Sequence, residues 1–218
     1  MHSVTLRGSG RTIQVGKLLC LGKNYPDHAK EMNEEVPSAP VVFLKPSTAL
    51  IPDGGEVIVP SLTHELHHEV ELVILIGREG RNVPIERAIE YILGYGVGLD
   101  MTMRDVQREA KRHGEPWTVS KGFDTSAPVS QFAPREEIPD PHALGISLKV
   151  NGAVRQQSNT RNMIYRIDRT IAYLSGIFTL EAGDLIFTGT PEGVGPVVSG
   201  DALEAHITSV GTLNVRIG

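Results

Sequence analysis

The sequence contains a single cysteine, Cys20, among its 218 residues. No intramolecular disulfide can form, which is typical of a protein from a reducing compartment. Basic residues are scattered and the net charge is −5, so no basic surface for nucleic acid or acidic lipids is expected. No apolar run approaches the length of a membrane span or of a signal-peptide core. We therefore expect a cytoplasmic protein without a nucleic-acid or membrane partner.

Turn-forming residues, in contrast, are plentiful, with 14 prolines and 23 glycines between short stretches rich in Val, Ile and Leu. Short apolar or alternating segments bounded by turn residues are typical of β-strands. The strands predicted in this way are Lys17–Leu21, Val41–Leu44, Glu56–Val59, His68–Gly77, Ile92–Asp100, Leu144–Val150, Leu185–Thr188, Leu203–Ile207 and Leu213–Ile217. The predicted fold is mixed β with a few helices (α+β).

Helical patterns are fewer than strand patterns. Pro84–Tyr91 opens with proline, as a helix start can, and Thr102–His113 is a second candidate. Asn162–Ser175 has apolar residues at the period of an amphipathic helix. The pair Asn151-Gly152 lies between two alternating segments, and this pair is typical of a two-residue hairpin turn.

The strongest chemical signal is a pair of acidic residues in a strongly apolar segment. Glu69 and Glu71 alternate along a predicted strand, so they project from one face, roughly 7 Å apart along the chain. A solvated strand edge is the alternative explanation for such a pair. Asp100, at the end of a second apolar strand, favours a metal site, and ligation by carboxylates alone suits Mg²⁺ or Mn²⁺ better than zinc.

A zinc-protease pattern overlaps this segment. His64, Glu65 and His68 match H-E-x-x-H, whose chemistry requires both histidines on one helical face. Pro60 lies just upstream and a β-rich run follows, so a helix is not expected here. On an extended chain the two histidines would be roughly 13 Å apart. We therefore expect these histidines in a surface loop, or in one case as a partner of the metal ligands.

A possible acid–base pair lies nearer the N-terminus. If the chain is helical after Pro26, His28 and Glu31 are three residues apart and share a face. A carboxylate beside an imidazole fixes its tautomer and raises its basicity, which suits a general base. The same spacing also fits an ordinary surface ion pair.

The glycine-rich segment 188–195 has no nucleotide-binding signature. It could present backbone N–H groups and the Thr190 hydroxyl to a carboxylate, or it could be a simple turn between strands.

Five motifs, in order along the chain, carry a family resemblance. They are Gly22-x-Asn24-Tyr25-x-Asp27-His28, Phe43-Leu44-Lys45-Pro46, His68-Glu69-x-Glu71-Leu72, Leu99-Asp100-x-Thr102-x-Arg104-Asp105-Val106-Gln107 and Thr188-Gly189-Thr190-Pro191. Together they resemble the fumarylacetoacetate hydrolase family, and more narrowly its short acylpyruvase and oxaloacetate decarboxylase branch. The resemblance implies a β-roll, a homodimer, and a single catalytic domain over residues 17–218 preceded by a short strand segment at 1–16.

The resemblance also implies that Glu69, Glu71 and Asp100 bind Mg²⁺ or Mn²⁺. Some relatives carry a further acidic ligand shortly before the lid tyrosine, where this chain has Lys23 and Asn24. That departure is a reason to expect a substrate smaller than fumarylacetoacetate that carries a carboxylate.

Further roles follow from the same resemblance. His28 and Glu31 match a dyad on a mobile lid, and Lys121 matches a lysine that orients substrate or water near the metal. The substrate contacts that it implies are Lys23, Tyr25, Arg104, Gln107 and Thr190.

The implied activity is C–C bond cleavage in acylpyruvates, or decarboxylation or tautomerisation of oxaloacetate, all on small 2-oxo acids. A 2-hydroxyhepta-2,4-diene-1,7-dioate isomerase of homoprotocatechuate-type catabolism and a fumarylpyruvate hydrolase are alternatives. A non-catalytic protein that binds a metal or metabolite would keep the three carboxylates without needing His28. Both His28 and Lys121 are present, which favours an enzyme.

Overall fold

The computed structural model describes residues 2–32 and 35–218. Position 1 of the predicted N-terminal segment 1–16, and positions 33 and 34 of the predicted domain 17–218, therefore lie outside the described residues. Strands dominate, and the helices are short, so the expected mixed β fold with a few helices is confirmed. The helices are α1 (Pro26–Glu31), α2 (Arg104–His113), α3 (Thr118–Lys121) and α4 (Ile167–Ile177), with the 3-10 helices η1 (Ser47–Ala49), η2 (Ile85–Tyr91), η3 (Arg135–Glu137) and η4 (Thr160–Asn162).

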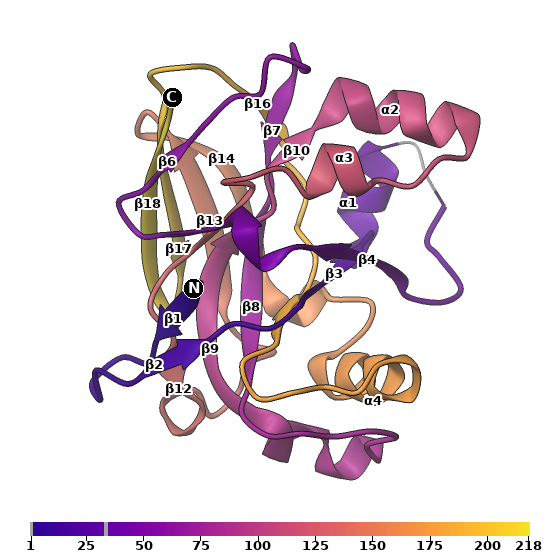
Figure 1. Ribbon diagram of the computed structural model, residues 1–218, viewed down its shortest axis with the longest axis vertical. Coiled ribbons are helices and arrows are strands. Elements are labelled where there is room, and N and C mark those ends of the chain that lie inside the picture. Colours follow the sequence, from indigo (N-terminus) through magenta and orange to yellow (C-terminus); the bar gives the residue numbers. More distant parts are fainter. Residues whose placement is uncertain (1, 33–34) are drawn as a thin grey trace.

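A mixed sheet of eight strands forms the centre of the fold, in the order β4-β3-β15-β8-β9-β11-β5, with β12 also paired to β9. In Figure 1, α1, α2 and α3 lie together near one end of its central strands, and α4 lies near the other end. Its strands are β3 (Leu18–Gly22), β4 (Val41–Lys45), β5 (Leu50–Pro52), β8 (Val70–Ile76), β9 (Ile92–Leu99), β11 (Ala127–Val129), β12 (Ala133–Pro134) and β15 (Leu185–Phe187).

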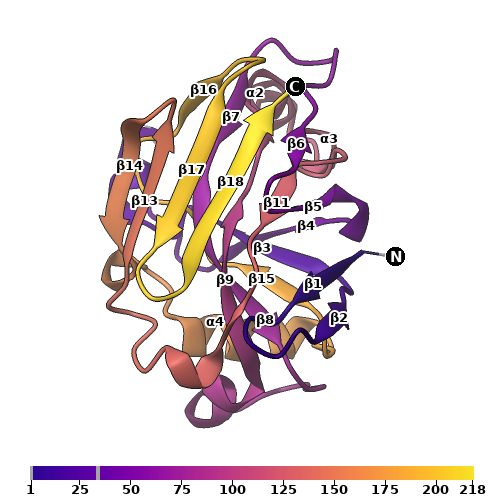
Figure 2. The same cartoon turned by 90° about the vertical axis from the view of Figure 1, so that its left-hand side faces the viewer.

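A second sheet has five strands in the order β14-β13-β17-β18-β6 and faces the viewer in Figure 2. Its β13–β14 hairpin turns at Asn151 and Gly152, which both have positive φ, as the predicted two-residue turn requires. The strands are β6 (Glu56–Val57), β13 (Gly145–Val150), β14 (Ala153–Asn159), β17 (Ala202–Ile207) and β18 (Gly211–Ile217).

Two smaller sheets complete the fold, in the orders β1-β2 and β10-β7-β16. The second of them corrects one prediction: the expected single strand His68–Gly77 is two strands, β7 and β8, interrupted at Glu69. The strands are β1 (Ser3–Thr5), β2 (Thr12–Gln14), β7 (Leu66–His68), β10 (Thr102–Met103) and β16 (Gly195–Val197).

The three predicted helices differ from the observed ones in helix type or in the residue at which they begin. The first helical segment is the 3-10 helix η2 rather than an α-helix, and α2 begins at Arg104 because the two residues before it pair with β7. The last helix begins at Ile167, not at Asn162. None of the helices in the part of the chain that the structure describes is long and apolar enough to cross a membrane.

From Leu72 to Ile76, strand β8 is apolar without interruption because both of its faces are buried. Leu72 and Ile74 face the main core, which the five-stranded sheet and α4 cover, whereas Val73 and Leu75 face a second core with the N-terminal strands. Burying each such side chain contributes roughly 1.5–3 kcal/mol. Because side chains alternate, Glu71 projects on the same side as Val73, at the end of the second core.

Candidate metal centre and active site

Three buried carboxylates meet where the two longest central strands end. Glu71 lies in β8, Glu69 directly before it, and Asp100 directly after β9. The antiparallel register places Glu71 opposite Gly98, and the Asp100 N–H donates to the Glu69 carbonyl at 2.9 Å. One oxygen from each carboxylate lies within 4.8 Å of the others, and all three residues are at least 95% buried. The solvated-edge explanation of the glutamate pair is therefore excluded.

Two buried cations hold this triad together on one side. The Lys121 ammonium lies 2.7 Å from Glu69 Oε2, from Asp100 Oδ2 and from the Thr102 hydroxyl. The Arg104 guanidinium pairs with the other Glu69 oxygen. Burial raises the pKa of Glu69, but these two cations outweigh it and hold that pKa well below its usual range.

A third buried cation, Lys45, had no role assigned from the sequence. Its Nζ lies 2.8 Å from Asp100 Oδ1 and donates to the carbonyls of Met101, Lys121 and Ser126. The sequence signal was present in the motif Phe43-Leu44-Lys45-Pro46, where a lysine ends an apolar strand. Without the structure, nothing distinguishes it from an exposed strand end.

Two observations show that the residues fit a divalent cation. Asp100 Oδ1 is buried and accepts no hydrogen bond from the described residues, although the Lys45 ammonium lies 2.8 Å away. Burial, together with the carboxylates of Asp100 and Glu69, raises the pKa of Glu71 well above its usual range. An additional positive charge beside these atoms would remove both penalties, and three carboxylates are the donor set that Mg²⁺ or Mn²⁺ prefers.

Glu71 has one further partner, supplied by the glycine-rich segment. The Gly189 N–H donates to Glu71 Oε2 at 2.7 Å. Gly189 has φ +94°, and a Cβ there would lie 2.6 Å from the Asn24 side chain. Only glycine fits this close approach.

A small cavity of about 30 Å³ opens beside the triad. It brings together most of the predicted site residues, from five separate parts of the chain, with four aromatic or long side chains not assigned from the sequence. Its lining includes Lys23, His28, Met32, Phe43, Glu69, Glu71, Arg104, Gln107, Lys111, Trp117, Lys121 and Thr190.

His28 and Glu31 lie on α1, and His28 lines the cavity. His28 Nδ1 is 3.4 Å from Glu31 Oε2, and both Glu31 carboxylate oxygens accept the Gly193 N–H at 3.1 Å. Burial lowers the pKa of His28, although the carboxylates of Glu69 and Glu31 act in the opposite direction. The His28 ring is buried whereas Glu31 is exposed, so the pair is only partly at the surface, and its role as an acid–base dyad stays a prediction.

Arg104 links the cavity to the histidine-rich motif. It donates to Gln107 Oε1 at 2.6 Å and to His67 Nδ1 at 3.3 Å, and His67 Nε2 lies 2.9 Å from Glu65. Burial and the neighbouring Arg104 lower the pKa of His67 to about 4, so it accepts from Arg104 as a neutral ring. The motif lies mainly in strand β7 rather than in the expected surface loop, and, as expected, it does not form a zinc-binding helix.

Two outcomes differ from the expected surroundings of the site. His68 is buried and bonded to Gln156, not in a surface loop. Tyr25 is fully buried in the main core, and its hydroxyl has no hydrogen-bond partner among the described residues. Because Tyr25 does not line the cavity, its contact with substrate stays a prediction.

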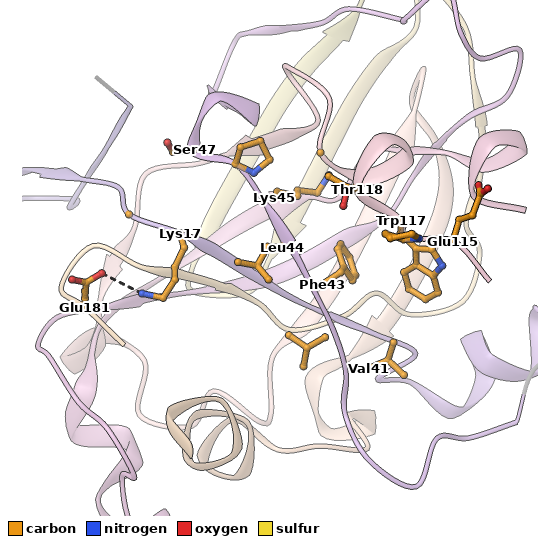
Figure 3. Close-up of a pocket in the computed structure, with 15 residues that line it drawn as sticks. Lys17, Val41, Phe43, Leu44, Lys45, Ser47, Glu115, Trp117, Thr118 and Glu181 are labelled. Atoms are coloured by element: carbon orange, nitrogen blue, oxygen red, sulfur yellow. Dashed lines mark hydrogen bonds and ion pairs between the residues drawn. The ribbon is translucent and has the colours of Figure 1, made fainter. Parts of the chain in front are cut away.

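A larger groove of about 890 Å³ lies on the other side of an aromatic pair. Phe43 and Trp117, with ring centroids 5.8 Å apart, border both the groove and the small cavity. Figure 3 shows them beside Val41 and Leu44 of the edge strand β4. The groove is mainly apolar, whereas the charged groups gather in the small cavity, so we place the chemistry there.

The fold, the buried triad and the sequence define the class of the protein. The family model described as fumarylacetoacetate (FAA) hydrolase C-terminal matches residues 17–218, and the chain belongs to this family of enzymes. The expected β-roll is thereby confirmed.

Three individual members of the family are similar to this chain over most of its length. The chain is 52% identical to the mitochondrial oxaloacetate tautomerase FAHD1 of Mus musculus, over 92% of this chain and 90% of that protein. The crystal structure of fumarylpyruvate hydrolase from Pseudomonas aeruginosa with Mn²⁺ and pyruvate matches with a TM-score of 0.95 at 42% identity, over 99% of this chain and 94% of the other. A 2-hydroxyhepta-2,4-diene-1,7-dioate isomerase from Mycobacterium marinum matches with a TM-score of 0.83 at 36% identity, over 96% and 81%.

Proposed function

We propose that this chain is a divalent-metal-dependent enzyme of small dicarboxylic 2-oxo acids, with keto–enol tautomerisation of oxaloacetate as its main reaction. The charge balance of the site carries the proposal. The triad and its three buried cations, Lys45, Arg104 and Lys121, cancel in charge. A bound divalent cation then leaves this buried set with a surplus of two positive charges, and Lys23 and Lys111 also line the cavity. Both features favour a ligand with two negative charges, such as a dicarboxylate. The name of the mouse relative supports the same substrate.

Glu69, Glu71 and Asp100 would hold the metal. When bound, Mg²⁺ or Mn²⁺ supplies Lewis-acid stabilisation of the negative charge that develops on the oxygen of a 2-oxo acid. Lys121 keeps two of the carboxylates at a fixed separation and presents a further positive charge at the cavity. The proposed substrate contacts are Lys23, Arg104, Gln107 and Thr190, which line the cavity, together with Tyr25.

The proton would be moved by His28. Its lowered pKa keeps the imidazole neutral near pH 7, so it can take a proton from C3 of oxaloacetate. The electron pair of the broken C–H bond becomes the C2–C3 double bond, the carbonyl π pair moves to the 2-oxo oxygen, and transfer of the proton from the imidazolium to that oxygen completes the enol. Ketonisation is the same transfer in reverse, from the enol oxygen to C3. Glu31 fixes the orientation of the ring.

The same groups support a second reaction, C–C cleavage of acylpyruvates, including fumarylpyruvate. Here His28 takes a proton from water, and the hydroxide attacks the distal carbonyl. The C–C bond then breaks, and its electron pair leaves with pyruvate enolate while the attacked carbonyl becomes a carboxylic acid. The His28–Glu31 pair favours this candidate, because simple decarboxylation of oxaloacetate needs no base for water. An isomerase of 2-hydroxyhepta-2,4-diene-1,7-dioate, the activity in the name of the Mycobacterium marinum relative, would use the proton transfer described above for oxaloacetate, not the attack by water.

The test compares three rates for the wild-type protein, with Mg²⁺, with Mn²⁺ and with a chelator. They are the loss of oxaloacetate enol absorbance, the release of CO₂ from oxaloacetate, and the release of pyruvate from acetylpyruvate. We expect metal-dependent tautomerisation to be fastest. A metal-loaded protein that leaves all three at their uncatalysed rates contradicts the proposal and favours a non-catalytic metal-binding role.

The expectations on oligomeric state, cellular location and domain bounds stay proposals. We propose a homodimer, on the family resemblance, to be checked by sedimentation equilibrium, and a cytoplasmic location, supported by the single buried Cys20, to be checked by cell fractionation. We also propose that residues 17–218 are the catalytic domain, because the family model covers this range. Removing residues 1–16 should then lower stability, since Val4 and Leu6 pack into the second core, but leave metal affinity unchanged.

A further inference from the structure

Strand β14 presents mostly exposed side chains but buries one polar residue completely. Gln156 is 1% exposed, whereas Val154, Arg155 and Gln157 are exposed. The pairing with β13 shifts register here, and Arg155 has no partner in it. An irregularity of this kind re-aims a side chain and is common next to active sites. It turns Gln156 inward, toward the loop that carries Thr190.

The amide of Gln156 uses both of its ends. Its Oε1 accepts the Val70 N–H at 3.1 Å and faces His68 Nδ1 at 3.0 Å. Its Nε2 donates to the Pro191 carbonyl at 2.9 Å and to Thr190 Oγ1 at 2.8 Å. A backbone N–H can only donate and a backbone carbonyl can only accept, so Val70 and Pro191 fix which end is oxygen.

This orientation determines the direction of the Thr190 hydroxyl. Because Thr190 Oγ1 accepts from Gln156, the hydroxyl hydrogen points elsewhere. Within residues 2–32 and 35–218, no hydrogen bond has this hydroxyl as donor. Thr190 lines the cavity with Arg104 and Gln107, so a ligand oxygen there is the available acceptor.

We propose that Gln156 is a positioning residue that directs the Thr190 hydroxyl to donate to the carboxylate of a bound 2-oxo acid. The inference rests on the proposed function only for the ligand class. The same amide holds the backbone at Val70, between Glu69 and Glu71. Gln156 thereby sets the distance between the hydroxyl that grips the carboxylate and the strand that carries the metal ligands.

The experiment is a double-mutant cycle with pyruvate as the probe. Gln156→Met keeps the approximate shape but loses all four contacts, and Thr190→Val removes the hydroxyl. Pyruvate binding to the Mn²⁺-loaded proteins is measured by calorimetry, together with Mn²⁺ affinity and thermal unfolding. Each single change should weaken pyruvate about tenfold, and the double change should weaken it no further. In turnover of oxaloacetate, Gln156→Met should raise KM and leave kcat within about threefold.

Three further variants keep the test sharp. Thr190→Ser retains a hydroxyl and should preserve both pyruvate binding and its dependence on Gln156. Gln156→Glu keeps the acceptor for Val70 and should weaken pyruvate even if Gln156→Met folds poorly, since its second oxygen cannot donate. Gln157→Met, at the exposed neighbour on the same strand, should change nothing.

The inference is overturned if Gln156→Met weakens pyruvate equally with Thr190→Val present, because the effect would then not pass through the hydroxyl. It is also overturned if the Mn²⁺-loaded wild type does not bind pyruvate. The effects of Gln156→Met and Thr190→Val on pyruvate binding could prove coupled although the wild type turns over neither oxaloacetate nor acetylpyruvate. That result would support the role of Gln156 and refute the proposed function.

Discussion

The two walls of the small cavity are built in different ways. The metal wall consists of Glu69, Glu71 and Asp100 at the ends of β8 and β9, each buried and in contact with a cation or a backbone N–H. The α1 wall is a six-residue helix without a side-chain N-cap, attached to the glycine-rich loop through Glu31. The fold therefore fixes the groups that bind, whereas the groups that move protons depend on few contacts.

The largest effect is expected where the metal wall is most buried. Lys45→Met should lower the free energy of unfolding by about 3–5 kcal/mol, since it removes one of the two cations paired with the buried Asp100 and leaves its Oδ1 without a charged partner. Chemical denaturation of the metal-free protein measures this. Lys149→Met is the matched control, because its ion pair with Glu204 is exposed and should contribute less than about 1 kcal/mol. Equal effects of the two substitutions would refute the comparison.

The second-largest effect is expected on metal affinity, from a change to one of the metal ligands. Glu71→Gln should weaken Mn²⁺ binding by more than about 100-fold, since changes around a metal's ligands alone cost about 10–100-fold. Calorimetric titration with Mn²⁺ is the measurement, and Glu204→Gln on the exposed face of β17 is the control. Unchanged Mn²⁺ affinity in Glu71→Gln would remove this glutamate from the metal site.

The α1 wall should show the opposite behaviour. His28→Ala should lower kcat for acetylpyruvate by about 100-fold or more, the contribution of a general base, while Mn²⁺ affinity changes less than about threefold. Asp27→Ala, at the exposed neighbouring position, should leave both unchanged. Loss of Mn²⁺ binding in His28→Ala would mean that the two walls are not separate.

The smallest effect concerns pH. Burial lowers the pKa of His28 below its ordinary value of 6.5, so the neutral, proton-accepting form persists as the pH falls to that value. Folding favours this neutral form, and its contribution to stability is present above pH 6.5 and lost as the pH falls through the lowered pKa. We expect kcat/KM for acetylpyruvate to hold from pH 8 to 6.5 and to decline only below it. A decline centred above pH 6.5 would contradict this assignment.

The sequence was informative where chemistry follows from local spacing. The alternation of Glu69 and Glu71 and the position of Asp100 at a strand end predicted that the three meet, and the structure brings them together. The spacing of His28 and Glu31 predicted their contact in the same way.

Partners that depend on pairing between distant strands were not predictable. Lys45 ends β4, which three strands separate from β9 in the sheet order, and yet it contacts Asp100. Gln156 reaches Thr190 because an irregular edge strand turns it inward. Strand β14 was not among the strands predicted by range, although the hairpin turn predicted at Asn151-Gly152 implied a partner for β13, because its side chains are mostly polar and exposed. The break at Glu69 was missed because the apolar pattern continues on both sides of it.

The glycine-rich loop between β15 and β16 touches three separate parts of the site. The Gly189 N–H binds Glu71, Thr190 and Pro191 bind the Gln156 amide, and the Gly193 N–H binds the carboxylate on α1. The length of this loop is therefore fixed. Inserting or deleting one residue would shift all three attachments at once, whereas an insertion at the exposed β13–β14 turn would disturb none of them. Variation in chain length among relatives should be absent from this loop and gather at such turns.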